Sequence, residues 1–270
     1  METGSLLEVG ESVFRVASFN INSVRVRLPL VLEWLDKQQV DVLCLQETKV
    51  ENKDFPLEDF TGRGYNAVFS GRKSYNGVAI ISPHKIEKVH TGIGDWAEPN
   101  EARLIEATIK GIPVVNTYIP QGYKPASDKF IYKLRWIRAM RDYFSGRFTP
   151  DDCVIWMGDF NVAPEPIDVH NPKRLYGRVG FHPEEHEALQ HVKEWGFVDV
   201  FRLHVKEGGH YTFWDYRGPK LFERNIGWRV DHIWATSPMA ARSQSAWIDT
   251  KPRGGTKPSD HTFITAEFTL

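Results

Sequence analysis

Cysteine, long apolar runs and net charge are all scarce in this sequence, and each scarcity argues against a class of protein. The 270 residues include two cysteines, which stand singly in the apolar runs DVLCLQ and DCVIWM. Such spacing argues against a disulfide framework or a zinc site and is typical of free thiols in a reducing compartment. No apolar run approaches the ~20 residues that a membrane-spanning helix requires. We therefore expect a cytoplasmic protein without a membrane partner.

The start of the chain resembles no export signal. Residues 1–12, METGSLLEVGES, have neither a basic n-region nor an apolar h-region, and we interpret them as a flexible tail. Residues 13–270 contain no low-complexity linker, repeat or break in composition. Because 41% of the chain is apolar, it can bury a core of its own, and we predict one domain over residues 13–270.

A net charge of −1 excludes the global positive field of many nucleic-acid-binding proteins, so a polyanion would have to meet a local patch. Two basic stretches suit this role. The first contains Lys124, Lys129, Lys133, Arg135, Arg138 and Arg141, and the second contains Arg217, Lys220, Arg224 and Arg229 among Tyr216, Phe222 and Trp228. Basic side chains beside aromatic ones suit phosphates and exposed bases. Taken singly, each stretch is equally well explained as a solvated helix face or a basic loop.

Strand-like and helix-like periods alternate along the chain, which predicts an α/β fold with mixed strand connections. The expected strands are FRVASFN, DVLCLQ, NGVAIIS, ARLIEATI, PVVNTYI, DDCVIWMG, RVDHIW and TFITAEF. Helices are expected behind Ser23, behind Ser127 and from Pro183 to Trp195, where Gly196 ends the last one.

Polar residues collect where these strands end. They are Asn20 and Asn22, Glu47, Tyr118, Asp159 and Asn161, Asp231, and Asp260 with His261. Any one of them has a simple explanation as a turn residue. Strand ends are also where packed α/β sheets gather their ligands, and the whole set predicts one convergent site.

Hydrolysis of a phosphate ester is the chemistry that such a set could support. Glu47, with Asn20 or Asn22 nearby, can hold Mg²⁺ through one or two protein oxygens while water and substrate phosphate complete the octahedron.

The remaining groups of the set suit the attacking water and the phosphate. Asp159 is an oxygen base that can orient or deprotonate the water. Asn161 and Tyr118 can donate hydrogen bonds to the non-bridging oxygens, and His261 paired with Asp231 can add positive charge. No covalent nucleophile is needed.

A competing motif is HPEEH, which fits the H-x-x-E-H signature of a zinc protease. Pro183 suits the first position of a helix, which would leave His182 outside it as a cap. The two histidines would then not share a face, so we disfavour a zinc site.

The motifs SFNINSVRVR, CLQETKV, NGVAIIS, EARLI, YIPQG, GDFNVAP, YTFWDYR, GWRVDHI and PSDH occur in this order. In this respect the chain resembles the exonuclease III class of abasic-site endonucleases, within the endonuclease/exonuclease/phosphatase superfamily, from about Phe14 to Phe268. The resemblance implies a four-layered α/β sandwich, in which two packed mixed β-sheets are flanked by helices. Residues 13–270 would form one domain of this superfamily.

The implied activity is that of a metal-dependent DNA repair nuclease that uses Mg²⁺, with Mn²⁺ as the alternative. It would cut double-stranded DNA 5′ to abasic sites, remove 3′ nucleotides and 3′ blocking groups as a 3′-5′ exonuclease and 3′-phosphatase, or do both, with a monomer as the default. The alternative is a superfamily phosphatase that acts on an inositol phosphate or a phospholipid head group.

Further residue roles follow from the resemblance. Asp260 would lie close to the metal, and Arg103 would hold a backbone phosphate. Phe213 and Trp228 would line the pocket for an extruded sugar, which is recognised by shape and apolar contact. Lys124 and Arg229, from the two basic stretches, would contact DNA.

The loop at residues 169–180 departs from the family pattern. It reads VHNPKRLYGRVG, whereas familiar members tend to have small or amide residues in its middle. Arg174, Leu175 and Tyr176 are bulkier. They would either narrow the pocket and favour trimming of 3′ ends, or point into solvent.

Overall fold

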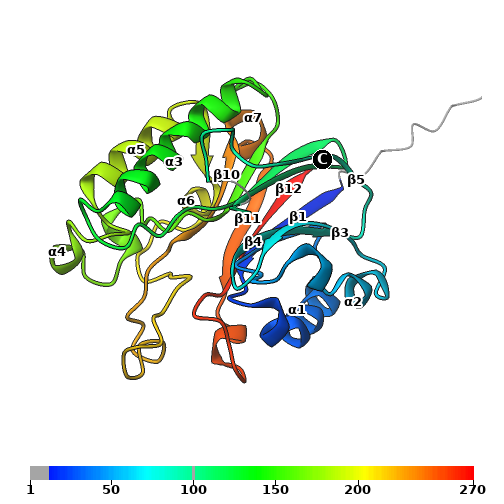
Figure 1. The fold of residues 1–270 in the computed structure, drawn as a ribbon, viewed down its shortest axis with the longest axis horizontal. Helices are drawn as coiled ribbons and strands as arrows, with labels where there is room; N and C mark the ends of the chain where they lie inside the picture. The colour runs from blue at the N-terminus through cyan, green and yellow to red at the C-terminus, as the bar shows by residue number, and fades with distance from the viewer. Residues whose placement is uncertain (1–11, 99–100) are drawn as a thin grey trace, which may run out of the picture.

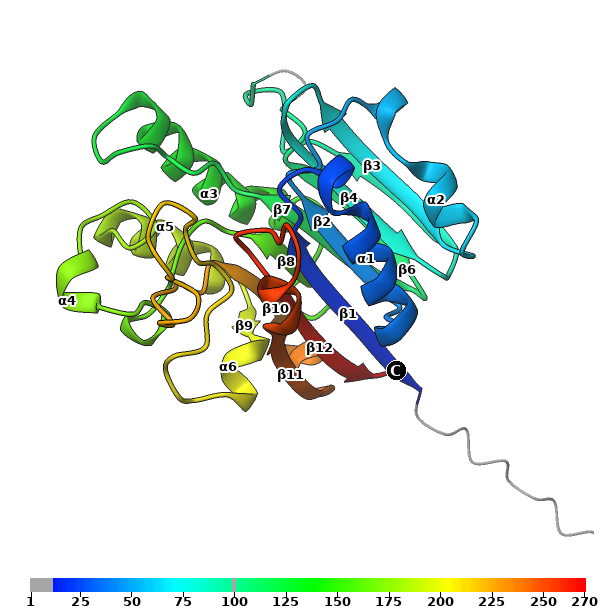
Figure 2. The same cartoon turned by 90° about the horizontal axis from the view of Figure 1, so that it is seen from below.

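Two stacked β-sheets with helices on both outer faces make up the fold, as the ribbon shows from two sides (Figures 1 and 2). This computed structural model describes residues 12–98 and 101–270. The flexible tail expected at residues 1–12 lies outside the described residues except for Ser12.

The first sheet has six strands in the order β11-β12-β1-β2-β4-β3. Their bounds are β1 (Val13–Asn20), β2 (Val42–Gln46), β3 (Asn66–Arg72), β4 (Tyr75–Ser82), β11 (Ser243–Asp249) and β12 (Phe263–Thr269). The second sheet also has six, in the order β5-β6-β7-β8-β10-β9. Its strands are β5 (Ile86–Thr91), β6 (Leu104–Ile109), β7 (Ile112–Tyr118), β8 (Ile155–Asp159), β9 (Phe197–Asp199) and β10 (Asp231–Thr236).

Each sheet contains a parallel pair at its centre, and these two pairs position the polar residues. In the first sheet β1 runs parallel to β2, with Asn20 opposite Gln46. In the second sheet β7 runs parallel to β8, with Tyr118 opposite Asp159. Because side chains at the carboxyl ends of parallel strands meet at one edge, both pairs deliver polar groups to the same place.

Helices cover the outer face of each sheet. α1 (Val24–Gln38) and α2 (Leu57–Thr61) lie on the first sheet, and α3 (Asp128–Ser145) and α5 (Pro183–Lys193) lie on the second (Figures 1 and 2). Shorter helices are α4 (Pro172–Leu175), α6 (Val200–His204) and α7 (Ser237–Ala240), with 3₁₀ turns at Asn52–Asp54, Pro166–Asp168 and Lys251–Gly254. The three expected helices are confirmed. Ser127 and His182 cap theirs through the side chain, whereas Ser23 does not.

Three buried clusters correspond to the three spaces between the layers. One lies between the sheets and includes Phe14, Val42 and Ile155. The second packs α3 and α5 on the second sheet around Trp156, and the third packs α1 and α2 on the first sheet around Phe19. The expected four-layered α/β sandwich is thus confirmed. Among the described residues, no helix has the length and apolar character to span a membrane.

Candidate active site

Asn20 joins the ends of the two sheets. Its side-chain Nδ2 donates to Glu47 Oε1 and to Asp159 Oδ2, at 2.8 Å in each case. Glu47 follows β2 of one sheet and Asp159 ends β8 of the other. The buried Asn20 amide therefore fixes the position of Glu47, the expected metal ligand, relative to Asp159, the expected base.

Around Glu47 the structure gathers the other residues expected near a metal. Asn22 Nδ2 donates to Asp260 Oδ1 at 2.9 Å, and the backbone N–H of Asn22 donates to Asn20 Oδ1 at 3.0 Å. Sequence reasoning missed Lys49, whose Nζ lies 2.7 Å from Glu47 Oε2 and 2.5 Å from Asn22 Oδ1. Burial opposes ionisation of Glu47, but Lys49 and the Asn20 amide outweigh it and lower its pKa. The Glu47 side chain is thus a carboxylate, the form that can bind a metal cation.

The backbone at this edge is strained in a way that the sequence did not reveal. Asn22, Glu47, Lys49 and Asn161 all have positive φ angles, between 46° and 57°. A non-glycine residue in this region costs of the order of 1–3 kcal/mol, and such residues cluster at functional sites. The surrounding hydrogen bonds hold these side chains in orientations that a relaxed turn would not give.

Asp159, Asp231 and His261 form a buried triad beside Glu47. His261 Nδ1 is 2.8 Å from Asp231 Oδ2, while His261 Nε2 is 3.9 Å from Asp159 Oδ2. Burial and the charge of Asp231 raise the pKa of Asp159 to about 7. For His261, burial disfavours the charge, but Asp231 and Asp159 outweigh it and raise the pKa to about 10. The two carboxylates therefore favour the charged form of the imidazole.

The triad could itself bind a metal by proximity, because one ligand atom from each residue lies within 4.8 Å of the others. The protonated imidazole argues against this, since a ligating histidine must be neutral. Glu47 lines an open cavity together with Asp260 and offers the oxygen ligands that hard cations prefer. The Glu47 side of the cavity therefore suits a hard cation better than the triad does.

Asn161 and Tyr118 also lie beside Asp159. The backbone N–H of Asn161 donates to Asp159 Oδ1 at 2.8 Å, and its Nδ2 donates to Ile119 O at 2.9 Å. Burial and the nearby Glu47 and Asp159 carboxylates raise the pKa of Tyr118 well above its usual value. Its phenol therefore stays protonated, with the hydroxyl close to the Glu47 carboxylate.

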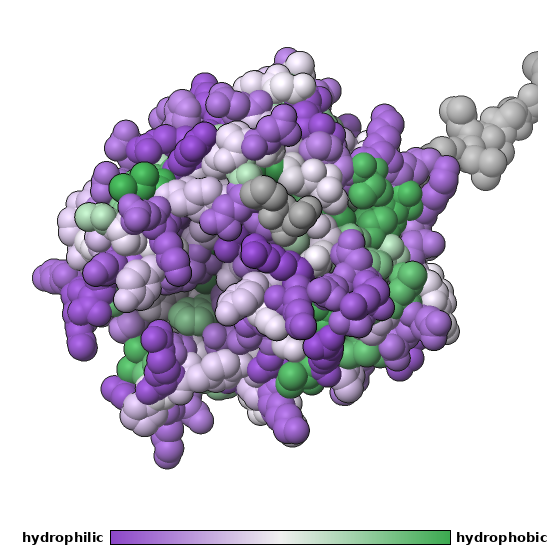
Figure 3. Space-filling model, in the orientation of Figure 1, coloured by the Kyte–Doolittle hydropathy of each residue, from purple (hydrophilic) through white to green (hydrophobic). Residues whose placement is uncertain are grey.

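A cavity of about 790 Å³ opens directly onto these groups. Phe213 and Trp228 line it and face each other as partners in an antiparallel bridge, and the Phe213 ring lies 4.9 Å from that of His261. In the space-filling view, the surface is hollowed between the layer of α3 and α5 and two long loops, residues 205–230 and 250–262. The rim of the hollow is mainly hydrophilic (Figure 3). The apolar wall expected for a sugar thus lies beside the reactive groups.

The 169–180 loop contributes five residues to this cavity, and one of its three bulky residues, Leu175, is among them. Leu175, Gly177, Arg178, Val179 and Gly180 line it. Arg174 and Tyr176 are exposed and lie outside the lining. Of the two alternatives, the structure thus supports a place in the pocket wall for Leu175 and orientation toward solvent for Arg174 and Tyr176, whose contact with DNA stays a prediction.

The expectation that Arg229 contacts DNA is wrong. Its side chain is completely buried, and it binds Asp168 through Nε at 2.7 Å and Nη2 at 2.9 Å, and Asp199 through Nη2 at 2.7 Å. Lys133, from the first basic stretch, is also fully buried. Both side chains form ion pairs inside the protein, because the fold brings carboxylates that are distant in sequence next to them.

Lys124 and Arg103 occupy different positions around the site. Lys124 is exposed and lines the cavity mouth, where a phosphate could reach it. Arg103 lies 4.8 Å from the centre of the Tyr118 ring and donates to the Tyr118 carbonyl at 3.2 Å. Arg103 therefore supports Tyr118, and the phosphate contact expected of it stays a prediction.

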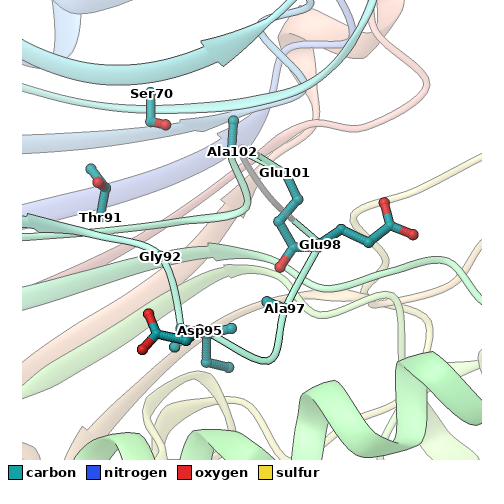
Figure 4. A pocket seen from close by; sticks show the side chains of 10 residues that line it. Ser70, Thr91, Gly92, Asp95, Ala97, Glu98, Glu101 and Ala102 are labelled. Carbon is teal, nitrogen blue, oxygen red and sulfur yellow. The ribbon is translucent and has the colours of Figure 1, made fainter.

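A second cavity, of about 340 Å³, shares no lining residue with the first (Figure 4). Ser70, Thr91 and the loop that carries Asp95, Glu98 and Glu101 line it. The Glu101 carboxylate is already bound by Trp136 Nε1 and the Tyr132 hydroxyl. This acidic lining suits neither phosphate nor DNA.

Comparison with known proteins agrees with this geometry. Residues 17–261 match the model of the Endonuclease/Exonuclease/phosphatase family. The chain is 33% identical to exodeoxyribonuclease III of Haemophilus influenzae over 263 residues, which covers 93% of this chain and 98% of that protein.

Two solved structures are similar in fold and in sequence. The structure of an AP endonuclease from Archaeoglobus fulgidus shares 47% identity at a TM-score of 0.92, covering 95% of this chain and all of that one. The 3′ phosphatase NExo from Neisseria, bound to product DNA hairpin, shares 34% identity at a TM-score of 0.91 with the same coverage. The chain therefore belongs to the endonuclease/exonuclease/phosphatase family, in the group of exodeoxyribonuclease III and the AP endonucleases.

Proposed function

We propose that the protein is a cytoplasmic, monomeric DNA repair nuclease that hydrolyses the phosphodiester 5′ to an abasic site in double-stranded DNA. The observation that carries the proposal is the position of the Phe213–Trp228 wall, which places an apolar surface in the same cavity as Asn161 and His261. A sugar without a base has little to offer a polar pocket and suits an apolar one. Removal of 3′ nucleotides and 3′ blocking groups would use the same residues on a strand end.

In this proposal Asp159 accepts the proton of the attacking water. Its raised pKa makes it a better proton acceptor than an ordinary aspartate. Asn161 and Tyr118 donate hydrogen bonds to the phosphate oxygens. His261, held by Asp231, places a positive charge next to the developing negative charge of the pentacovalent species.

A divalent cation, Mg²⁺ in the first instance, fits the Glu47 side of the site. Glu47 and Asp260 would hold it, with Asn20 and Asn22 orienting these ligands or binding through water. When bound, such an ion polarises the scissile phosphate and stabilises its charge. The carboxylate and amide oxygens match the ligand preference of Mg²⁺, which binds through one or two carboxylates and keeps several waters.

The defining experiment uses two labelled duplexes, one with an internal tetrahydrofuran abasic analogue and one intact with a recessed 3′ end. Each is incubated with Mg²⁺ and separately with EDTA. We expect metal-dependent cutting immediately 5′ to the analogue. Stepwise shortening of the intact duplex alone would identify a 3′ exonuclease. Cleavage of neither duplex would reject the nuclease and revive the head-group phosphatase, which the nuclease relatives disfavour.

Gly180 offers a test of the pocket itself. It has a φ of +87°, and an added Cβ would lie 3.3 Å from Trp228 Cζ3. We expect Gly180→Ala to lower the initial rate of cutting at the analogue by about tenfold. The added Cβ is too close to the Trp228 ring, so the ring must shift, and a small misplacement of the substrate is costly.

Gly177 supplies the matched control for backbone strain. Its φ of +82° is nearly the same, but an added Cβ would meet no atom within 4 Å. Gly177→Ala should therefore show the cost of the left-handed backbone alone. Equal rates for the two alanine variants would mean that Trp228 does not bound the substrate.

Replacing Glu47 with glutamine should raise the Mg²⁺ concentration needed for half-maximal cutting. The neutral amide attracts a cation less strongly, and changes around metal ligands typically cost about 10- to 100-fold in affinity. The measurement is a Mg²⁺ titration of the initial rate. Glu51→Gln, which alters a carboxylate paired with Lys53 on the same segment, serves as the control. An unchanged titration for Glu47→Gln would remove this residue from the metal site.

A further inference from the structure

A buried ion pair lies behind the candidate active site, between Lys133 of α3 and Glu185 of α5. Both side chains are completely buried, and Lys133 Nζ lies 2.5 Å from Glu185 Oε1. Removing two charges from water is costly, and a well-packed apolar pair often holds elements together at least as well. The packing of α3 on α5 alone therefore does not explain the pair.

The pair reaches three loop segments through hydrogen bonds to their backbone. Lys133 Nζ donates to the carbonyl of Asn161 at 2.7 Å and to that of Gln121 at 3.3 Å. Glu185 Oε2 accepts from the N–H groups of Gly180 at 2.7 Å and His182 at 3.1 Å. One ion pair thus links the residue expected to bind the phosphate, the cavity mouth and the pocket wall.

Each of these segments needs a restraint that the sheets do not provide. Asn161 comes directly after β8 and has a φ of 52°. Gly180 has a φ of +87° and approaches Trp228. The Lys133 stem packs under Gly122, where a Cβ would come within 3.0 Å of Lys133 Cδ. The fixed charges hold carbonyl and N–H groups in place where strand hydrogen bonding has ended.

We infer that Lys133 and Glu185 are positioning residues, which hold Asn161 and the cavity rim in the geometry required for hydrolysis. This inference rests on the proposed nuclease function. Neither side chain reaches the cavity, so neither is a catalytic residue. Their effect should appear in kcat rather than in KM, because misaligned donors weaken the transition state more than they weaken substrate binding.

The test is the double variant Lys133→Met with Glu185→Gln. It leaves no unpaired buried charge, and the new amide at position 185 keeps an oxygen for the N–H of Gly180, so the protein should fold. The contact to Asn161 is lost. We expect kcat for cutting at the tetrahydrofuran analogue to fall about 10- to 100-fold with little change in KM. Lys133→Arg, which keeps the donors, should retain most of the activity.

A second measurement does not depend on activity. Amide hydrogen exchange, followed by mass spectrometry, should accelerate in residues 119–123 and 160–164 of the double variant and remain unchanged in the strands. The matched control is Arg147→Met with Glu106→Gln, which removes another ion pair of the α3 region at a site remote from the cavity lining. It should retain wild-type kcat and wild-type exchange in both segments.

The inference is overturned if the folded double variant keeps wild-type kcat, or if exchange in residues 119–123 and 160–164 does not change. A wild-type protein that cuts neither duplex would instead contradict the nuclease function. In that case, the exchange comparison still decides whether the ion pair holds these loops.

Discussion

Asp159→Asn is expected to lower kcat for abasic-site cutting by about 10²- to 10⁴-fold, the range typical of losing a general base. An asparagine cannot accept the proton of the attacking water. It keeps the size and shape of the aspartate, and its single amide oxygen can still accept from either Asn20 Nδ2 or the N–H of Asn161, which now bond to separate carboxylate oxygens. Single-turnover rates on the tetrahydrofuran duplex measure the loss of chemistry apart from product release.

The thermal stability of the Asp159→Asn variant, unlike its activity, should not fall. Burial and the charge of Asp231 raise the pKa of Asp159 to about 7. A carboxyl group with a raised pKa destabilises the folded state at pH values above the folded-state pKa, where it is ionised. We therefore expect Asp159→Asn to unfold at or above the wild-type temperature at pH 8.

Asp54→Asn, at an exposed ion pair with Arg25, is the control for activity. An Asp159→Asn variant with near wild-type kcat would rule out this residue as the base.

The position of the candidate active site could be predicted from the sequence because each of its main residues ends or directly follows an apolar strand. Asn20 and Glu47 follow the parallel strands of one sheet, and Tyr118 and Asp159 follow those of the other. Strand patterns are local, so they could be located without the fold. The strand ends themselves predicted one convergent site. The packing of one sheet on the other, which brings Asn20 to both Glu47 and Asp159, is not local, and only the family resemblance implied it.

The roles of the basic residues could not be predicted in the same way. Arg229 and Lys133 belong to stretches of sequence whose other cations are mostly exposed, yet both are buried against carboxylates. Asp168 lies 61 positions before Arg229, and no local pattern relates them. The same is true of the loop at residues 169–180, where the order of the chain did not indicate that Arg174 and Tyr176 would face solvent while Leu175 and Arg178 face the cavity.

Removing the charge of Asp168 should destabilise the fold more than any surface change. This buried carboxylate accepts two hydrogen bonds from Arg229 and one from Arg202, so Asp168→Asn leaves two guanidinium groups poorly compensated. Breaking a buried ion pair by removing one partner typically costs about 3–5 kcal/mol. Urea unfolding at pH 7 measures the loss. Asp215→Asn is the matched control, because its partner Arg217 is 90% exposed and such pairs contribute about 1 kcal/mol at most.

The pH dependence of that loss identifies its cause. Burial alone would raise the pKa of Asp168, but Arg229 and Arg202 outweigh it and lower the pKa below the usual value. A carboxyl group with a lowered pKa stabilises the folded state above its unfolded pKa of about 3.9, and this contribution disappears as the pH falls through the lower folded pKa. The difference between wild type and Asp168→Asn should therefore be constant from pH 7 to about pH 5 and shrink in more acidic solution. A difference that stays constant into strong acid would mean that the asparagine destabilises by its shape, because a lost charge must titrate.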